Sequence, residues 1–204
     1  MSATAVPPNR SVKGQAAPEP TLAFATPQAW EAWLAKHHAT STGLWLRLYK
    51  KDSGHATVTY AQALDAALCY GWIDGQTKPL DAESWLRRFT PRRPRSAWSK
   101  INLGHVERLI QAKRMKPAGL AQVQQAQADG RWQRAYDSPK SLSIPDDFLK
   151  ALGKDKQAKA FFSTLNRANL YAIAYRLQTA KKPETRQRRM EQILVMLAQG
   201  NKFH

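Results

Sequence analysis

The sequence has a single cysteine, Cys69, and therefore cannot form an intramolecular disulfide. Cys69 falls at the apolar end of a predicted helix, where a small buried side chain is expected rather than a reactive thiol. No group of Cys and His residues has the spacing of a zinc site, and we expect neither a metal nor another cofactor. Phosphate-binding glycine-rich loops and the G-x-S-x-G and H-E-x-x-H motifs are absent as well. These absences remove several common classes of enzyme and leave the question of catalysis open.

Long apolar runs are also missing. No segment approaches the length of a transmembrane helix, and the N-terminal residues lack the continuous apolar segment that is typical of an export signal. We therefore expect a soluble, cytoplasmic protein that does not insert into a membrane.

Acidic residues are scarce relative to basic ones. The chain has 32 Lys and Arg residues against 15 Asp and Glu residues, which gives a formal net charge of +17. Such an excess raises the affinity for polyanions and does not specify a fold. It leaves open nucleic acid, anionic lipid and small phosphorylated or carboxylated ligands as partners. The sequence does not predict the oligomeric state.

Hydrophobic periodicity predicts an α+β fold with a small antiparallel sheet flanked by helices. Leu44, Leu46 and Leu48 alternate with other residues, a pattern typical of a strand with one apolar face. Helices are expected where apolar residues recur every three or four positions after a capping residue such as Thr26 or Thr59. The expected elements are helices at 27–38, 59–70, 102–115 and 117–130 and strands at 44–50, 72–77 and 84–90. We expect the last two strands to pair as a hairpin.

From residue 144 onward the pattern is helical throughout, as in an all-helical C-terminal region. Its expected helices are 145–153, 155–165, 167–179 and 183–200. Residues 1–21 are rich in Pro, Ala and Ser and are expected to form a disordered tail. The chain would then comprise this tail, an α+β region at 22–138 and a helical region at 144–200. Because the connection near 138–145 is short, we expect the two ordered regions to pack together.

A cation-rich stretch, residues 69–102, is the strongest candidate for a binding site. No acid lies between Glu83 and Glu107, and aromatic residues are interleaved with the cations. Arginine suits anion binding because its planar guanidinium forms paired hydrogen bonds with phosphate or carboxylate. The predicted ligand-binding residues are Arg87, Arg88, Arg92, Arg93, Arg95, Lys100, Trp72, Trp85 and Trp98.

The arginines of this stretch also have a structural interpretation. Arg87 and Arg88 fall on a predicted strand, where cross-strand ion pairs with acids of the hairpin, Asp74 among them, are equally expected. Residues 91–96 contain two prolines, which exclude a regular strand interior and indicate a stiff, exposed loop. The binding interpretation is therefore strongest for the arginines of that loop.

Two further interpretations stay open. The first is nucleic-acid binding, because a second basic run lies at 181–189 and aromatic residues accompany the cations, although no recognised nucleic-acid motif is present. The second is an enzyme that acts on a small anionic substrate, with Asp74 beside Trp72 as a general acid or base. A structural ion pair is the competing role for Asp74.

Two long blocks of unusual composition stand out, ALCYGWIDG and FTPRRPRSAWSKIN, and shorter ones accompany them: WEAWLAKHH, GLWLRLYKK, RMKPAGLAQV, DGRWQRAYDSP and TAKKPETRQRR. With these segments the chain resembles the bacterial YdeI/OmpD-associated family, also called bacteriocin-protection proteins. The resemblance extends from about Phe24 to Gly200. A departure is Lys113, where the family pattern has glycine before Arg-Met.

The resemblance implies a soluble α+β bacterial protein that protects against bacteriocins or cationic peptides under stress. It also implies an association with an outer-membrane porin in some members, and it brings no established catalytic residues. The net charge of +17 argues against direct sequestration of a cationic peptide, because like charges repel.

Overall fold

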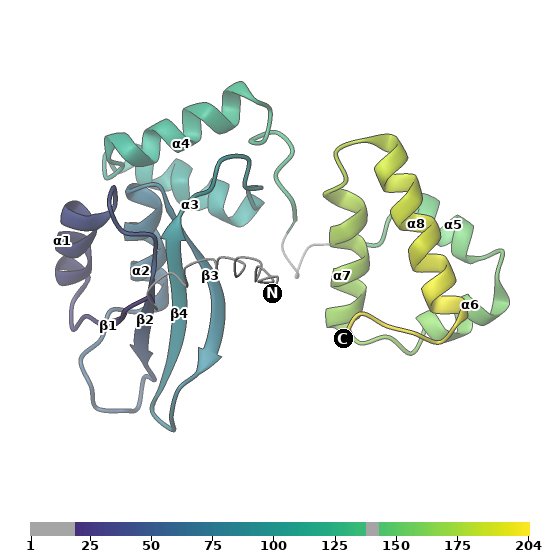
Figure 1. Ribbon diagram of the computed structural model, residues 1–204, viewed down its shortest axis with the longest axis horizontal. Helices are drawn as coiled ribbons and strands as arrows, with labels where there is room; N and C mark the ends of the chain where they lie inside the picture. The colour runs from purple at the N-terminus through teal and green to yellow at the C-terminus, as the bar shows by residue number, and fades with distance from the viewer. Residues whose placement is uncertain (1–18, 138–142) are drawn as a thin grey trace, which may run out of the picture.

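The computed structural model describes residues 19–137 and 143–204, and it confirms the expected fold class. In these residues a four-stranded sheet with helices α1 to α4 forms the first region, and helices α5 to α8 form the second (Figure 1).

The four strands form one sheet in the order β1-β2-β4-β3. Their bounds are Thr21–Ala23 for β1, Leu44–Tyr49 for β2, Trp72–Pro79 for β3 and Ser84–Pro91 for β4. The β2–β4 and β3–β4 pairs are antiparallel, and β3 and β4 form the predicted hairpin. The sheet is mixed rather than purely antiparallel, because β1 pairs in parallel with β2. This strand has only three residues, too few for an alternating pattern to be recognised in the sequence.

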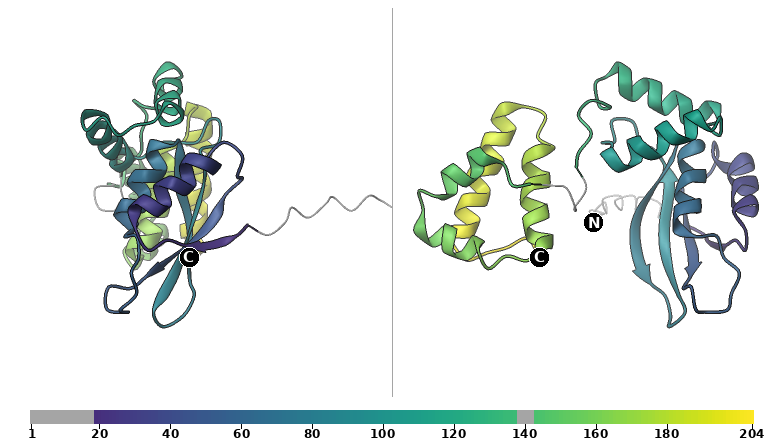
Figure 2. Two further views of the ribbon diagram at one scale, coloured as in Figure 1. Left: turned by 90° about the vertical axis from the view of Figure 1, so that its left-hand side faces the viewer. Right: turned by 180° about the vertical axis from the view of Figure 1, so that it is seen from behind.

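Two helices cover one face of the sheet (Figures 1 and 2). Helix α1 (Pro27–His37) begins after Thr26, whose side chain accepts a hydrogen bond from the first turn. Helix α2 (Tyr60–Cys69) begins after Thr59, which forms the predicted capping box with Gln62. Both starts follow from local sequence, because the capping side chains satisfy backbone N–H groups that have no partner within the helix.

A hydrophobic core lies between these helices and the sheet. Its buried members come from α1, α2, the strands and the loop before α2, namely Trp30, Leu34, Leu44, Leu46, Leu48, Val58, Ala63, Ala66, Ala67, Trp72 and Phe89. The β2–β4 register pairs Leu46 with Arg87 and Leu48 with Trp85, so Arg87 lies on the face that the helices cover.

Two further helices, α3 (Lys100–Gln111) and α4 (Pro117–Ala128), lie beyond the end of the sheet at which β4 finishes (Figure 2). The predicted start of α3 at Asn102 is wrong. Ser99 is the capping residue, and its Oγ accepts a hydrogen bond from the Asn102 N–H at 3.2 Å. A second core joins these helices to α2, and its buried members are Leu64, Leu68, Cys69, Trp98, Val106, Leu109, Val123, Ala126 and Ala135.

The helical region contains the four predicted helices. Their bounds are Asp146–Leu152 for α5, Lys156–Phe162 for α6, Arg167–Gln178 for α7 and Pro183–Ala198 for α8. They enclose a third core, whose buried members are Phe148, Leu152, Ala158, Ile173, Leu177, Ile193 and Leu197. This region therefore buries apolar residues of its own.

Residues 1–18 of the expected tail and residues 138–142 lie outside the described residues. Of the last residues of that expected tail, Glu19 bonds to Arg88 and Thr21 begins β1. The α+β region contacts α7 through the rings of Tyr136 and Tyr175, whose centroids are 5.0 Å apart. The domain boundaries themselves stay predictions.

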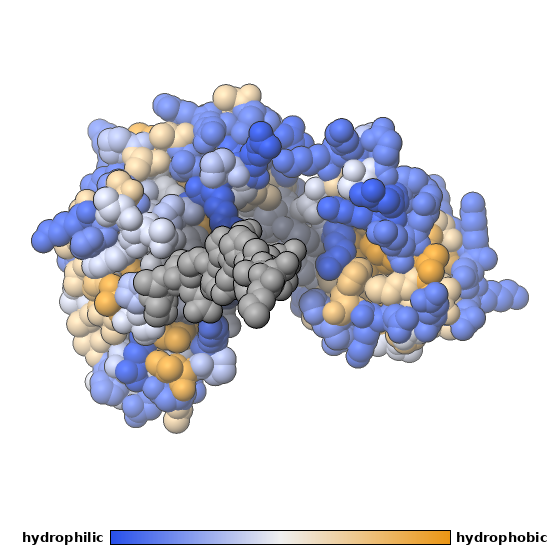
Figure 3. Space-filling model, viewed as in Figure 1, coloured by the Kyte–Doolittle hydropathy of each residue, from blue (hydrophilic) through white to orange (hydrophobic). Residues whose placement is uncertain are grey.

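Hydrophilic residues cover most of the face drawn in Figure 3, and groups of apolar residues lie between them in both regions. Within residues 19–137 and 143–204, no helix combines the length and the apolar character needed to cross a bilayer.

Candidate functional site

A pocket of about 510 Å³ lies where the β3–β4 hairpin meets α2 and α3, and we call it the Arg92 pocket. Its volume falls in the range of roughly 300–1,000 Å³ that is usual for small-molecule sites. The lining residues are Tyr60, Leu64, Ile73, Asp74, Gly75, Arg87, Arg92, Ala97, Ser99, Ile101, Asn102, His105, Tyr136 and Tyr171.

The hairpin supplies an ion pair to this pocket. A bulge in β3 between Asp74 and Thr77 shifts the register, and Asp74 lies close to Arg87 on the neighbouring strand. Arg87 Nε donates to Asp74 Oδ2 at 2.9 Å, and Arg87 Nη2 bonds to the same oxygen. Tyr60 Oη donates to that oxygen at 2.7 Å. The charge of Asp74 is therefore compensated by Arg87 and its position is fixed by two side chains.

Arg92 is the most buried cation of the pocket, with 6% of its surface exposed. Its Nη1 donates to Ser96 Oγ at 3.0 Å and to the Ala97 carbonyl at 3.3 Å. Its guanidinium carbon lies 3.5 Å from the centre of the Trp98 ring, a close cation–π contact. These contacts hold the guanidinium in place without neutralising its charge.

The positive charge of Arg92 has no carboxylate within ion-pair distance among the described residues, and its buried Nε has no hydrogen-bond partner there. Burial lowers the pKa of the guanidinium to about 10, because water no longer stabilises the charge. Arg92 still carries a proton at neutral pH. The expectation of a fully exposed loop at 91–96 is therefore wrong at Arg92, although Arg93 and Arg95 are exposed.

His105 is oriented by an acid from another helix. Its Nδ1 lies 2.8 Å from Asp65 Oδ1, and Arg108 Nη2 donates to both oxygens of that carboxylate at 2.7 Å. Burial acts to raise the pKa of Asp65, but the hydrogen bonds from Arg108 and His105 outweigh it and lower the pKa. An ionised carboxylate only accepts hydrogen bonds, so His105 Nδ1 carries the proton in this pair. When the ring is neutral, Nε2 is then an acceptor.

Three tyrosines, Tyr60, Tyr136 and Tyr171, line the pocket. Burial and the hydrogen bond to Asp74 raise the pKa of Tyr60 to about 12. Burial also raises the pKa of Tyr136 and of Tyr171, and the neighbouring Tyr175 adds to both shifts. All three hydroxyls stay protonated near neutral pH. Tyr60 already donates its proton to Asp74, so Tyr136 and Tyr171 are the two of these tyrosines that are left to donate to a ligand.

The side chains that line the Arg92 pocket favour an organic anion over a metal ion as its ligand. No group of three or more His, Cys, Asp or Glu side chains in residues 19–137 and 143–204 is arranged to hold a metal. Arginine and tyrosine are donors to oxyanions, and they surround apolar side chains such as Leu64 and Ile73. The pocket therefore offers a ligand both cationic donors and apolar surface.

The structure brings Asp74, Arg87 and Arg92 together, three of the residues that the sequence singles out. Trp98 lies against the Arg92 guanidinium, and Trp85 packs near Tyr60 with ring centroids 6.1 Å apart. These aromatic residues support the pocket without lining it.

The other predicted residues lie elsewhere. Trp72 is buried and its indole N–H donates to the His38 carbonyl at 3.0 Å. Arg88 pairs with Glu19, and Lys100 pairs with Asp137 at 2.8 Å. Arg93 and Arg95 remain on the surface and do not line the Arg92 pocket.

Sequence reasoning missed Tyr60, His105, Tyr136 and Tyr171. Asp65 precedes His105 by 40 positions, so no local spacing links the two residues. Tyr60 follows a capping residue and is interpreted from sequence only as the start of a helix. A local sequence signal exists for none of these contacts, because each one depends on tertiary packing.

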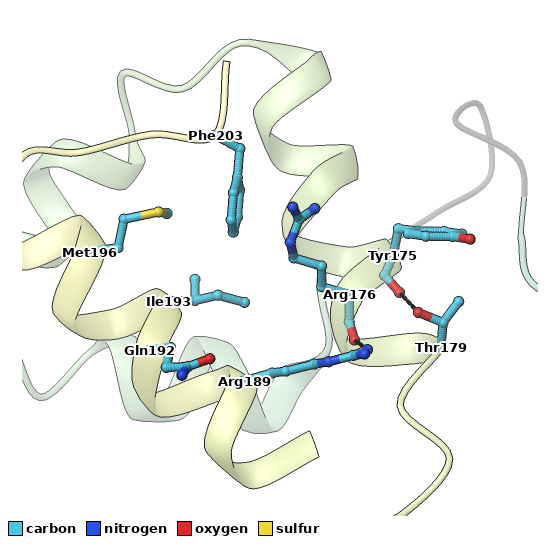
Figure 4. Close-up of a pocket in the computed structure, with 8 residues that line it drawn as sticks. All are labelled: Tyr175, Arg176, Thr179, Arg189, Gln192, Ile193, Met196 and Phe203. Atoms are coloured by element: carbon cyan, nitrogen blue, oxygen red, sulfur yellow. Dashed lines mark hydrogen bonds between the residues drawn. The ribbon is translucent and has the colours of Figure 1, made fainter. Parts of the chain in front are cut away.

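A second cavity, of about 520 Å³, lies between α7, α8 and the C-terminal residues (Figure 4). Arg189 Nη1 donates to the Arg176 carbonyl at 2.7 Å, and the Arg176 guanidinium lies 3.9 Å from the centre of the Phe203 ring. Figure 4 shows Ile193 and Met196 beside these groups. Arg176 is exposed to solvent, so this cavity contains no cation as deeply buried as Arg92.

Two family models match separate parts of the chain. Residues 22–122 match a domain of unknown function, DUF8412. Residues 141–200 match the family described as "Bacteriocin-protection, YdeI or OmpD-Associated". No curated protein and no solved structure matches the chain. The resemblance noted in the sequence is thus confirmed for the helical region, and most of the Arg92 pocket lies in the part that matches the other model.

Proposed function

We propose that this chain, whose helical region matches the bacteriocin-protection, YdeI or OmpD-associated family, is a protection protein that binds a small organic anion in the Arg92 pocket. The protective role and a cytoplasmic location are part of the proposal. We also propose the class of ligand, which is an acid with a flat or apolar body.

The observation that carries the proposal is the buried, uncompensated charge of Arg92. An unpaired buried cation is strongly destabilising, and proteins ordinarily neutralise it with a carboxylate or a bound anion. Arg87 has Asp74 as its counterion, whereas Arg92 has none among the described residues. A ligand carboxylate or phosphate beside Arg92 would remove that cost and would accept hydrogen bonds from the Tyr136 and Tyr171 hydroxyls.

The apolar walls indicate what else the ligand contains. Leu64, Ile73 and Ile101 line the same pocket as the donors. Pockets of this kind fix the orientation of a ligand with few polar groups and gain affinity from apolar contact. We therefore expect an aromatic or branched acid to bind better than a bare inorganic anion.

The test is calorimetric titration of the full chain with phenyl phosphate and benzoate, with benzyl alcohol as the neutral probe. Arg92→Gln should weaken binding of the two acids by at least tenfold, because a charge-assisted hydrogen bond contributes about 1.5–3 kcal/mol. Arg93→Gln is the matched control, since it removes the neighbouring exposed cation. Far-UV circular dichroism of both variants would establish that each is folded.

Two results would overturn the proposal. One is equal binding of benzyl alcohol and benzoate, which would remove any role for charge. The other is an equal loss of affinity in Arg92→Gln and Arg93→Gln, which would indicate attraction by the overall charge of +17. Strong binding of oligonucleotides that Arg93→Gln weakens and Arg92→Gln does not would favour the nucleic-acid alternative.

A catalytic role is a second candidate, favoured by one observation. The Asp65–His105 pair resembles the arrangement in which a carboxylate orients a histidine as a general base. Asp74, the acid expected from the sequence, is instead bonded to Arg87 and Tyr60. Turnover of a bound acid that His105→Gln abolishes without weakening binding would support this candidate. Binding without turnover would leave a binding protein.

A further inference from the structure

A third cavity, smaller and more basic, lies between the two regions of the protein. Its volume is about 60 Å³, far below the range of small-molecule sites. Its wall combines the loop after β4, the turn after α4 and the end of α7. We call it the Arg131 cavity, and its polar lining residues are Arg95, Arg131, Arg134, Gln178, Thr179 and Lys181.

Arg131 is the residue that distinguishes this cavity from a surface depression. It is 5% exposed, and its Nε donates to both oxygens of Asp129 at 2.7 and 2.8 Å. Its Nη1 donates to the Ser96 carbonyl at 3.0 Å. Its Nη2 is buried and has no hydrogen-bond partner among the described residues. A buried donor of a charged group is costly to leave unpaired, and Arg131 lines the cavity.

The charges around the cavity do not balance. Four cations line the cavity, and one of them, Arg131, is paired with a carboxylate, that of Asp129. Arg134 Nη2 donates to the backbone carbonyl of Asp129 rather than to a carboxylate. Arg95 and Lys181 have no carboxylate partner among the described residues. Like charges held together in this way attract an anion strongly.

The other polar groups of the cavity are already engaged. Gln178 exchanges two hydrogen bonds with Asp137, and Thr179 Oγ1 donates to the Tyr175 carbonyl at 2.7 Å. The end of α7 offers carbonyl groups, which do not attract an anion. The binding energy must therefore come from the guanidinium and ammonium groups.

We propose that the Arg131 cavity binds a free tetrahedral dianion, inorganic phosphate or sulfate, which links the α+β region to the helical region. The size of the cavity selects a small ion, and the arginines match its oxygen geometry. Arg95, Arg131 and Arg134 belong to the α+β region and Lys181 follows α7, so an ion bound by all four holds the two regions together. This site is separate from the Arg92 pocket and does not depend on the proposed function.

The test titrates the full chain with sodium phosphate or sodium sulfate and follows anion binding as a rise in the unfolding midpoint. Sodium chloride at equal ionic strength is the reference. Lys181→Ala should weaken phosphate binding about tenfold, because it removes one charge-assisted hydrogen bond. Lys182→Ala is the matched control, since it removes the adjacent exposed lysine, which does not line the cavity. Arg131→Gln should abolish binding, and Lys181→Ala keeps the test decisive if that buried variant does not fold.

Each outcome bears on the proposal. Specific stabilisation by phosphate and sulfate that Lys181→Ala removes and Lys182→Ala retains would support it. Equal effects of phosphate and chloride, or equal losses in both lysine variants, would overturn it in favour of general charge screening. A ten-nucleotide single-stranded RNA that binds through Lys181 and that phosphate does not displace would overturn the free-ion assignment and indicate a phosphodiester contact.

Discussion

Asp65 gives the fold a contribution to stability that depends on pH. Its hydrogen bonds lower the pKa in the folded state, so the ionised carboxylate is the form that stabilises the protein. The contribution is complete above the ordinary pKa of 3.8 and is lost as the pH falls through the lower folded-state value.

Asp65→Asn should therefore lower the free energy of unfolding at pH 6 by roughly 1–3 kcal/mol, because Arg108 and His105 lose an ionised acceptor. The difference from the wild type should shrink as the pH falls below 3.8. Urea unfolding at pH 6, 4 and 3 measures it, with the exposed Asp52→Asn as control. A difference that stays constant across this range would contradict the assignment.

Cys69 should react slowly with alkylating reagents. Its side chain is buried, and burial raises the pKa of the thiol from 9.0 to about 11. At pH 8 the thiolate fraction is then about 100-fold lower than in an ordinary thiol. Mass spectrometry after iodoacetamide treatment should find the native chain labelled at least 100-fold more slowly than the urea-unfolded chain. Similar rates would show that the residue is reached in the folded protein.

The sequence indicates some residues of the site and not others for a physical reason. The Arg87–Asp74 pair could be expected, because both residues lie on neighbouring strands of one hairpin. The burial of Arg92 could not, because it depends on the loop folding back so that Trp98 covers the guanidinium. The sequence predicts that this surface is positively charged. Which of its cations is buried away from water depends on tertiary packing.

At the scale of helices, Gly119 marks the contact between α4 and α2. A Cβ at this position would lie 2.2 Å from the Cys69 carbonyl oxygen and 2.7 Å from that of Leu68. Gly119→Ala should therefore force the helices apart and lower the free energy of unfolding by about 1–3 kcal/mol.

Gly104→Ala is the matched control for this change. Gly104 is also helical, in α3, and a Cβ there meets no atom within 4 Å. We expect this substitution to stabilise the protein by about 0.5–1 kcal/mol, because alanine loses less backbone entropy than glycine in a helix. Urea denaturation of both variants gives the comparison, and a loss of stability at both positions would contradict the close-contact argument.

Element boundaries were predictable where a local signal marks them. Thr26 and Thr59 cap helices, and Pro117 begins one, as their positions in the sequence indicate. Ser99 and Asn102 are both good caps, and local preference does not choose between them. The short strand β1 is defined by its pairing with β2, which lies more than 20 residues away along the chain. Such choices are made by tertiary contacts.

For the whole molecule, the two regions have separate cores. The core between the sheet and its helices and the core around α3 and α4 share the partly buried Tyr70, whereas the core of the helical region shares no residue with either. The described contacts between the regions are aromatic or polar, such as Tyr136 with Tyr175 and Asp137 with Gln178. Each region should therefore unfold with its own stability in a buffer without phosphate.

Spectroscopy can separate the regions, because all seven tryptophans lie between Trp30 and Trp132. Ile173→Ala removes a buried side chain from the helical core and should lower the stability of that region by about 2–5 kcal/mol. The midpoint followed by far-UV circular dichroism should fall while the tryptophan fluorescence midpoint stays unchanged. Leu46→Ala, in the sheet core, is the converse control and should lower the fluorescence midpoint.

Phosphate turns this comparison into a test of coupling between the regions. If an ion in the Arg131 cavity joins them, Ile173→Ala should lower the fluorescence midpoint in phosphate and not in chloride, because unfolding of one region then releases the ion from the other. A fluorescence midpoint that falls in both buffers would mean that the regions unfold as one unit even without the ion. A midpoint unchanged in both would mean that the ion does not link them.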